Sequence, residues 1–250
     1  MARGGAAADA LDAALDLLVG SHCLGCARPG RAWCAGCDAR LLGWPRPVSP
    51  DPCPPGLAPC WSAAPYDGVL RELVVAHKEH HVLALASPLG RLLAGSAAAA
   101  LDEQPDGASR VLLVPVPSRA STVRHRGHDA TRRLCLVAAR RLRERGFEVS
   151  VAPLLRQRAG VLDQAGLDSA ARRANLAGSM ASRGSRLARA ARRGGSASVL
   201  ICDDVLTTGS TAREAQRALE ANGVGVAAVV TAAATRRKFP DRLSPTRSTH

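Results

Sequence analysis

The stretch from Val199 to Thr211 constrains the fold of this chain more than any other. Four small apolar residues run without alternation from Val199 to Cys202, as expected for a strand buried on both faces of a parallel sheet. Two carboxylates, Asp203 and Asp204, follow at the carboxyl end of this strand, the edge at which open α/β sheets bind ligands. The pattern therefore predicts an α/β fold with a binding site at the end of a central strand.

The residues after the two carboxylates are typical of a phosphate-binding loop. They are Thr207, Thr208, Gly209, Ser210 and Thr211. A loop that enters a helix, here expected over residues 212–219, offers an anion backbone N–H groups, hydroxyls and the positive end of the helix dipole. Gly209 allows the backbone to close tightly, and Asp203 and Asp204 can accept hydrogen bonds from vicinal hydroxyls, so a ribose 5-phosphate fits both ends. The alternative is an ordinary helix N-cap formed by one of the three hydroxyl residues 207, 208 or 210.

The chain is strongly basic, with a net charge of +13 that comes almost entirely from arginine. The guanidinium fork suits phosphate oxygens, so the charge favours phosphorylated ligands or nucleic acid. A solvated surface in an arginine-rich composition explains it equally well. Aromatic residues make up only 2% of the chain, so the base-stacking platforms of single-strand binders are scarce.

The sequence favours a soluble, cytoplasmic protein without membrane insertion. No stretch approaches the eighteen or so apolar residues of a membrane span. Near the N-terminus, a helix is expected over residues 1–22, and Asp9, Asp12 and Asp16 interrupt any signal-like apolar core.

Two C-x-x-C pairs predict a metal site. They are Cys23 with Cys26 and Cys34 with Cys37, separated by seven residues. Four thiolates at this spacing can surround one tetrahedral centre, which Zn²⁺ prefers. A redox pair would need a single C-x-x-C in a βαβ setting, and a disulfide scaffold is disfavoured without a secretory signal. We expect a zinc-ribbon domain with one structural zinc ion.

The segment of residues 45–65 is rich in proline and contains Cys53 and Cys60, whose spacing does not form another pair. It is interpreted as a junction between the zinc ribbon and a main domain. Beyond it, periodicity predicts helices over 66–78, 83–100 and 130–145, and strands over 111–117, 148–155 and 225–234.

Two connections in the main domain are candidates for ligand contacts. Arg119, Arg124 and Arg126 follow the strand at 111–117 and could bind a pyrophosphate, although exposed arginines without a ligand are the alternative. Residues 156–180 form a long polar connection that could fold over a ligand as a lid and exclude water.

Taken together, these motifs resemble the ComF family of type I phosphoribosyltransferase-like proteins, which in several bacteria are associated with DNA uptake during competence. Residues 199–211 resemble the phosphoribosyl pyrophosphate (PRPP) motif of those enzymes. The other matching stretches are the two C-x-x-C pairs, Tyr66-Asp67-Gly68 through Lys78, Val114-Pro115-Val116-Pro117 with Arg126-Gly127, and Gln164 through Asn175. Where many members have Arg-Gly-Phe-Asn, this chain has Arg126-Gly127-His128-Asp129.

The resemblance implies a type I phosphoribosyltransferase fold, a parallel sheet flanked by helices, with an N-terminal zinc ribbon. The implied domains are a helix at 1–22, the zinc ribbon and junction at 23–60, the phosphoribosyltransferase-like domain at 61–235 and a basic tail at 236–250. It also implies PRPP with Mg²⁺ as ligand: Asp203 and Asp204, the catalytic positions, hold the ribose hydroxyls, residues 207–211 hold the 5-phosphate, and the three arginines stabilise the leaving pyrophosphate.

Three functions remain open at this point. The chain could be a working phosphoribosyltransferase, a PRPP-sensing DNA-uptake factor that binds single-stranded DNA, or a protein-interaction scaffold that keeps the ancestral site. The intact PRPP-like loop favours the first two. The acceptor and the oligomeric state are not predicted.

Overall fold

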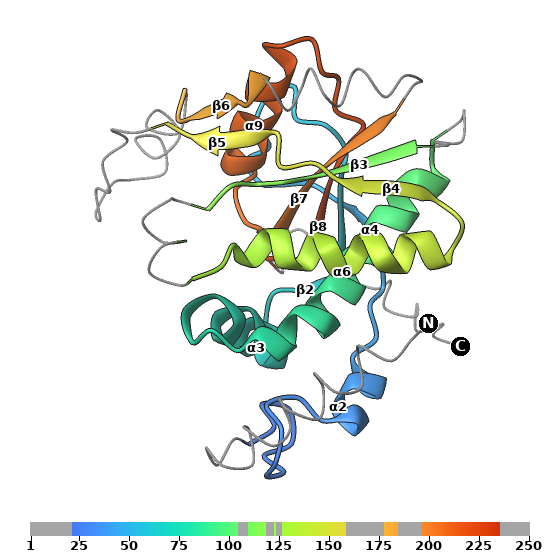
Figure 1. Cartoon of the computed structure of the whole chain (residues 1–250), viewed down its shortest axis with the longest axis vertical. Coiled ribbons are helices and arrows are strands. Elements are labelled where there is room, and N and C mark those ends of the chain that lie inside the picture. The colour runs from blue at the N-terminus through green and yellow to red at the C-terminus, as the bar shows by residue number, and fades with distance from the viewer. Residues whose placement is uncertain are drawn as a thin grey trace, which may run out of the picture.

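A mostly parallel six-stranded sheet forms the centre of the protein, as the computed structural model shows (Figure 1). The structure describes residues 22–104, 110–118, 123, 127–158, 178–184 and 197–235. The strands lie in the order β1-β2-β8-β7-β3-β4, and only β1 runs antiparallel to its neighbour. Their bounds are β1 Arg46–Val48, β2 Cys60–Pro65, β3 Arg110–Pro115, β4 Glu148–Val151, β7 Ser198–Leu206 and β8 Ala228–Ala234. The predicted α/β class is confirmed.

The apolar run at residues 199–202 lies in β7, one of the two central strands of the sheet. Leu200, Ile201 and Cys202 are fully buried between β3 on one side and β8 on the other. Both faces of β7 are covered by other elements, which explains why its hydrophobic pattern does not alternate.

Helices cover the sheet on both faces (Figure 1). One core cluster joins the sheet to α3, α4 and α6, and a second joins the opposite face to α9. The helices are α2 Ala35–Arg40, α3 Gly68–Glu79, α4 Ala86–Asp102, α6 Ala130–Glu144 and α9 Ser210–Glu220, and a 3₁₀ turn, η1, covers Leu83–Leu85. The helices expected over 66–78, 83–100, 130–145 and 212–219 are therefore confirmed within a few residues at each end.

The α4 segment corrects the expectation that no stretch resembles a membrane span. Residues Leu83–Asp102 reach a mean hydropathy of 1.3 over a span-length window, but 67% of that window is buried inside the fold. The burial is tight: a Cβ added at Gly90 would lie 2.5 Å from Cβ of Val137 on α6. Within the described residues this apolar helix is thus a core helix packed closely against α6.

The proline-rich segment supplies two strands of the sheet instead of only a junction. β1 is the edge strand, where Pro47 is tolerated because an edge strand leaves one row of N–H groups outside the ladder. β2 pairs in parallel with β8 along Cys60 to Pro65. The intervening residues 49–59 pack against α9, as described below.

The strand expected over 148–155 divides into two strands that belong to different sheets. β4 pairs with β3, whereas β5 (Leu155–Gln157) pairs antiparallel with β6 (Met180–Ser182) in a separate two-stranded sheet. Pro153 lies between β4 and β5 and cannot donate to a ladder hydrogen bond. The two ends of the expected lid, at residues 156–158 and 178–180, are therefore held together by this pair.

Candidate functional site

The two carboxylates predicted to bind ribose lie together at the carboxyl end of β7. Asp204 is 4% exposed, and Asp203 is partly exposed. Each side chain accepts a hydrogen bond from the next backbone N–H, at 2.9 Å for Asp203 and 2.8 Å for Asp204. Both line one cleft of about 530 Å³, a size within the usual range of small-ligand sites.

The walls of this cleft come from both layers of the fold. The lining residues are Tyr66, Val74, Val75, Lys78, Glu79, Val116, Pro117, Ser118, Thr131, Asp203, Asp204, Val205, Thr207 and Thr211. They lie on or next to α3, β3, α6, β7 and α9. The cleft therefore opens where several carboxyl ends of parallel strands meet, the edge predicted from the sequence.

Lys78 also lines the cleft, although the sequence alone did not predict a role for it. Its Nζ lies 2.6 Å from Oδ2 of Asp204, and the lysine side chain is 33% exposed. It is the last basic residue of α3, so only the fold brings it to the end of β7. Its ammonium neutralises one of two adjacent carboxylates.

The electrostatics of the pair favour a protonated Asp203. Burial, together with the negative charge of Asp204, raises the pKa of Asp203 to about 8, although the Lys78 ammonium acts in the opposite direction. The single positive charge of Lys78 does not neutralise the carboxylates of both Asp203 and Asp204. The site would therefore accept a further cation or hydroxyl donors.

The loop between β7 and α9 leaves the start of α9 without a side-chain cap. Gly209 is the N-cap of α9 and has the left-handed φ of +73°. No side chain caps the helix, so the alternative of a hydroxyl N-cap is wrong, although the hydroxyl of Thr208 contacts the N–H of Ser210 at 3.4 Å. Thr207 and Thr211 line the cleft, whereas Thr208 and Ser210 contact one another through their hydroxyls, 3.1 Å apart.

Close packing from the proline-rich segment fixes Gly209 in place. A Cβ added there would lie 2.7 Å from Cγ of Pro50 and 3.0 Å from Cδ2 of Leu57. The distance to Pro50 is shorter than real side chains tolerate, and the distance to Leu57 is tighter than most real contacts. Glycine is therefore required at this position for two reasons, its backbone conformation and the space available.

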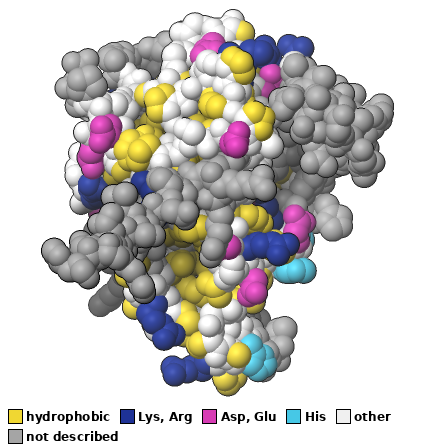
Figure 2. All heavy atoms as spheres, turned by 180° about the vertical axis from the view of Figure 1, so that it is seen from behind, with side chains coloured by type: hydrophobic (Ala, Val, Ile, Leu, Met, Phe, Trp, Pro, Cys, Tyr) yellow, Lys and Arg dark blue, Asp and Glu magenta, His cyan; other side chains and the backbone are white. Residues whose placement is uncertain are grey.

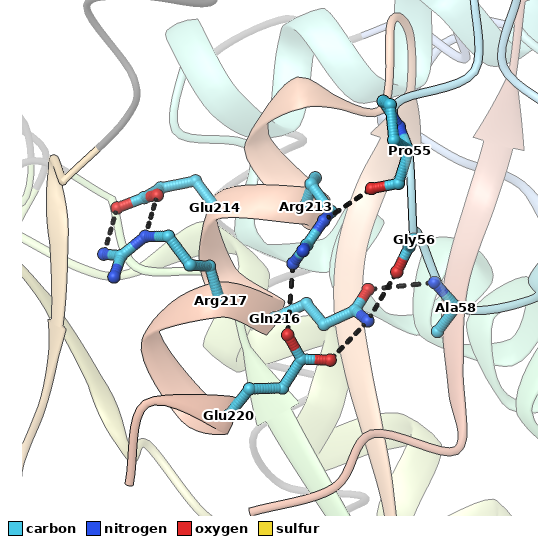
Figure 3. A network of polar contacts seen from close by, with 8 residues as sticks. All are labelled: Pro55, Gly56, Ala58, Arg213, Glu214, Gln216, Arg217 and Glu220. Carbon is cyan, nitrogen blue, oxygen red and sulfur yellow. Dashed lines mark hydrogen bonds and ion pairs between the residues drawn. The ribbon is translucent and has the colours of Figure 1, made fainter.

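Polar contacts hold α9 against the same segment (Figure 3). The amide oxygen of Gln216 accepts from the N–H of Ala58 at 2.9 Å, and its nitrogen donates to the carbonyl of Gly56 at 2.9 Å. Nε of Arg213 donates to the carbonyl of Pro55 at 2.9 Å. The helix α9 is thus anchored through its side chains to residues about 160 positions earlier in the chain.

The opposite side of α9 anchors the small β5–β6 sheet. The buried Glu214 accepts from the N–H of Met180 at 2.9 Å and pairs with Arg217, whose Nε lies 2.6 Å away. Burial raises the pKa of Glu214, but the hydrogen bonds from Arg217 and the backbone outweigh it and leave the pKa below its usual value. The base of the expected lid is therefore tied to the helix that follows the loop at residues 207–209.

Three histidines pack beside the cleft. The ring centroids of His77 and His128 are 5.9 Å apart, and those of His81 and His128 are 5.7 Å apart. His77 is 2% exposed, and burial lowers its pKa, so its ring is neutral at pH 7. Neighbouring residues at the end of α3 therefore differ in their contacts: Lys78 reaches the carboxylate of Asp204, whereas His77 and His81 pack against His128.

Several predicted features lie outside the described residues. They are the pyrophosphate candidates Arg119, Arg124 and Arg126, residues 159–177 of the expected lid, residues 1–21 of the N-terminal helix and the tail at 236–250. These expectations stay predictions.

A second candidate site is formed by the four predicted zinc ligands. Their sulfur atoms all lie within 4.8 Å of one another, and Sγ of Cys26 lies 3.7 Å from Sγ of Cys34. Tetrahedral zinc with Zn–S bonds of about 2.3 Å places its sulfurs about 3.8 Å apart. Backbone N–H groups of Cys34 and Cys37 donate to the sulfurs of Cys23 and Cys34 at 3.4 Å. The cluster therefore fits one zinc ion.

The two cysteine pairs are built differently. A Cβ at Gly25 would lie 2.8 Å from Sγ of Cys37, so the first turn needs glycine, whereas nothing lies within 4 Å of a Cβ at Gly36. The second pair is instead shaped by α2, because Cys34 is the N-cap of that helix and its sulfur accepts from the N–H of Cys37. Of the two glycines inside the cysteine pairs, only Gly25 is therefore required by close packing.

A bidentate ion pair attaches this zinc module, residues 22–41, to the sheet domain. Arg91 on α4 binds Asp38, with NH1 to Oδ2 at 2.6 Å and NH2 to Oδ1 at 3.1 Å. Apolar side chains gather nearby on the rear face, between the module and the sheet domain (Figure 2). Leu42 is 76% exposed and Trp44 is 66% exposed in the connecting segment.

No family model matches the chain, and no curated protein matches it in sequence.

Proposed function

We propose that the chain binds PRPP at the end of β7 and transfers its phosphoribosyl group, as a member of the ComF family with a type I phosphoribosyltransferase fold. One observation carries the proposal: adjacent carboxylates and a left-handed glycine loop line or border one cleft at the edge of a parallel sheet. A helix cap alone accounts for neither the carboxylates nor the glycine conformation. The zinc module and the cytoplasmic location belong to the same proposal, because the cytosol keeps cysteine thiolates reduced.

The residues of the cleft divide between the two ends of a ribose 5-phosphate. N–H groups at the start of α9 and the hydroxyls of Thr207 and Thr211 would bind the 5-phosphate. Asp203 and Asp204 would accept hydrogen bonds from the ribose hydroxyls. Lys78 already lies against Asp204, and once hydroxyls occupy that carboxylate, its ammonium is available to the leaving pyrophosphate.

The donor set also fits Mg²⁺. The ion prefers oxygen ligands, keeps several waters and binds through one or two carboxylates together with substrate phosphates. Asp203 and Asp204 would hold it. Burial and, after it, the negative charge of Asp204 raise the pKa of Asp203, and that second contribution favours such a cation. When bound, Mg²⁺ supplies charge neutralisation to the pyrophosphate oxygens.

The reaction is a substitution at the anomeric carbon of ribose. A nucleophilic atom of the acceptor forms a bond to that carbon, and the bond from the carbon to the pyrophosphate oxygen breaks with its electron pair. The chain would contribute by holding the ribose, the 5-phosphate and the pyrophosphate so that the attacking atom of the acceptor can approach the anomeric carbon opposite the leaving oxygen, the positioning on which such reactions depend.

A comparison of the affinity for PRPP with the affinities for its two fragments tests the proposal. The zinc-loaded protein is titrated calorimetrically with PRPP, ribose 5-phosphate and inorganic pyrophosphate, each with Mg²⁺. We expect PRPP to bind at least about tenfold more tightly than either fragment, and Lys78→Met to weaken PRPP more than ribose 5-phosphate. Arg71→Met, an exposed change on the same helix, is the matched control. A folded protein that binds none of the three would refute the proposal.

The runner-up function is binding of single-stranded DNA, and the solvent face of α6 favours it. Arg132, Arg133 and Arg140 are exposed along this helix, and only Arg140 of the three has an ion pair, a long one of 3.8 Å to Glu144, among the described residues. Binding through phosphate contacts predicts an affinity that falls steeply with salt. Arg133→Gln combined with Arg140→Gln should reduce that slope, and salt-independent or absent binding removes this candidate.

A further inference from the structure

A second cavity adjoins the carboxylate cleft. It has a volume of about 690 Å³ and is lined by Pro115, Pro117, Ser118, Val123, Asp129, Arg132, Pro153, Leu155, Arg156, Gln157 and Arg183. Pro117 and Ser118 line both spaces, so the two meet at the end of β3. This cavity lies between the start of α6 and the β5–β6 pair.

Its polar lining is predominantly positive. Three arginines line it against a single carboxylate, that of Asp129. That carboxylate is already engaged, because Asp129 is the N-cap of α6 and its Oδ1 accepts from the N–H of Arg132 at 3.0 Å. The guanidinium groups of Arg132 and Arg156 have no ion pair within the part of the chain that the structure describes. The third arginine, Arg183, is oriented by a hydrogen bond of 3.1 Å from its Nε to the carbonyl of Leu155.

The remaining lining is apolar and lacks aromatic rings. Prolines, Val123 and Leu155 supply the apolar surface. The chain has only six Trp, Tyr and Phe residues, and none of those in the described part lines this cavity. A ligand there would be recognised by charge and shape and would lack the aromatic stacking that usually holds a nucleobase.

The position of the cavity indicates which reactant it would hold. A substitution needs the incoming atom about 3–3.5 Å from the carbon that it attacks, so the acceptor must lie directly beside the ribose. The cavity is contiguous with the cleft that would hold the ribose, and Gln157 fixes their shared rim by donating to the carbonyl of Pro117 at 3.1 Å.

We propose that this cavity binds the phosphoribosyl acceptor and that the acceptor carries a carboxylate. The inference rests on the proposed function and names its substrate class. Arg132 and Arg156 would bind the carboxylate of the acceptor, and a nitrogen on the same molecule would attack the anomeric carbon. When that atom is a ring nitrogen without a hydrogen, pyrophosphate leaves with the electron pair and no proton has to be removed.

Binding of matched probes without PRPP tests the charge preference. The probes are pyridine-3-carboxylate with its neutral amide, and 2-aminobenzoate with aniline. We expect each acid to bind at least about tenfold more tightly than its neutral partner. Arg132→Gln and Arg156→Gln should each weaken the acids severalfold, whereas Arg133→Gln, an exposed neighbour on α6 outside the cavity, should not.

Three results would overturn the inference. One is equal binding, or no binding at millimolar concentration, of acid and neutral partner in both pairs. Another is an equal effect of Arg132→Gln and Arg133→Gln. The third is that Arg132→Gln and Arg156→Gln weaken inorganic pyrophosphate and PRPP as much as the acids, which would assign the cavity to the leaving group.

A different result, the failure of PRPP itself to bind, would refute the proposed function. Because the probe titrations contain no PRPP, they report on the charge preference of the cavity whichever way the PRPP titration ends. A positive PRPP titration with no acid preference removes the acceptor assignment alone.

Discussion

Replacing Gly209 by alanine tests the claim that packing from the proline-rich segment shapes the loop between β7 and α9. Alanine in the left-handed region, at the observed φ of +73°, costs about 1–2 kcal/mol. Its Cβ would also lie 2.7 Å from Pro50 and 3.0 Å from Leu57, and forced overpacking adds about 1–3 kcal/mol. We therefore expect the free energy of unfolding to fall by about 2–5 kcal/mol.

Gly223→Ala separates the two contributions. Gly223 has the same φ of +73°, but nothing lies within 4 Å of its added Cβ, so only the backbone cost of about 1–2 kcal/mol applies. Urea unfolding of both variants gives the packing contribution as their difference, expected at about 1–3 kcal/mol. Equal losses in the two variants would refute the packing argument, and the loop would then need another account.

Three further predictions concern the carboxylates, the metal and the module contact. The pKa of Asp203 is about 8 in the folded protein, whereas an unfolded aspartate titrates near about 3.9. The free energy of unfolding should therefore fall as the pH rises from about 4 to 8. Urea titrations should show that Asp203→Asn flattens this pH dependence. Metal analysis should find one zinc per chain, lost in Cys26→Ser but kept in Cys53→Ser, since the exposed Cys53 lies outside the cluster; loss in both would contradict the assignment. Arg91→Gln should lower stability by about 1 kcal/mol and speed hydrogen exchange in the zinc module, whereas Arg71→Gln should do neither.

The local sequence predicted those features whose causes are local. The apolar run followed by Asp203 and Asp204 predicted a central strand with two carboxylates toward its carboxyl end, because the run without alternation and the change to polar residues are visible in the chain itself. The tight turn at Gly209 was predicted for the same reason, because the residue type itself indicates it. The four cysteines could be grouped from spacing alone, since a tetrahedral ion restricts which spacings work.

The features that sequence reasoning missed depend on contacts between distant residues. β1 is three residues long and contains Pro47, and β2 is six residues long and ends at Pro65, so no periodicity reveals them. β2 is stabilised by β8 from the other end of the chain. Lys78 reaches Asp204 only because α3 packs across the end of the sheet. Likewise, Gln216 forms hydrogen bonds with backbone groups of Gly56 and Ala58. Such contacts cannot be predicted from residue types, because every residue type has a backbone carbonyl and nearly every one has a backbone N–H.

Calorimetric titration of PRPP and Mg²⁺ tests most directly the proposal that the chain binds PRPP at the end of β7. The titration compares wild type with the Asp203→Asn, Asp204→Asn double variant. Asp102→Asn with Glu103→Gln removes two adjacent exposed charges at the end of α4 and is the matched control. The account predicts micromolar-range binding to wild type and control, weakened by at least about tenfold in the double variant. Unchanged binding in a folded double variant, or no binding by a folded wild type, would contradict it.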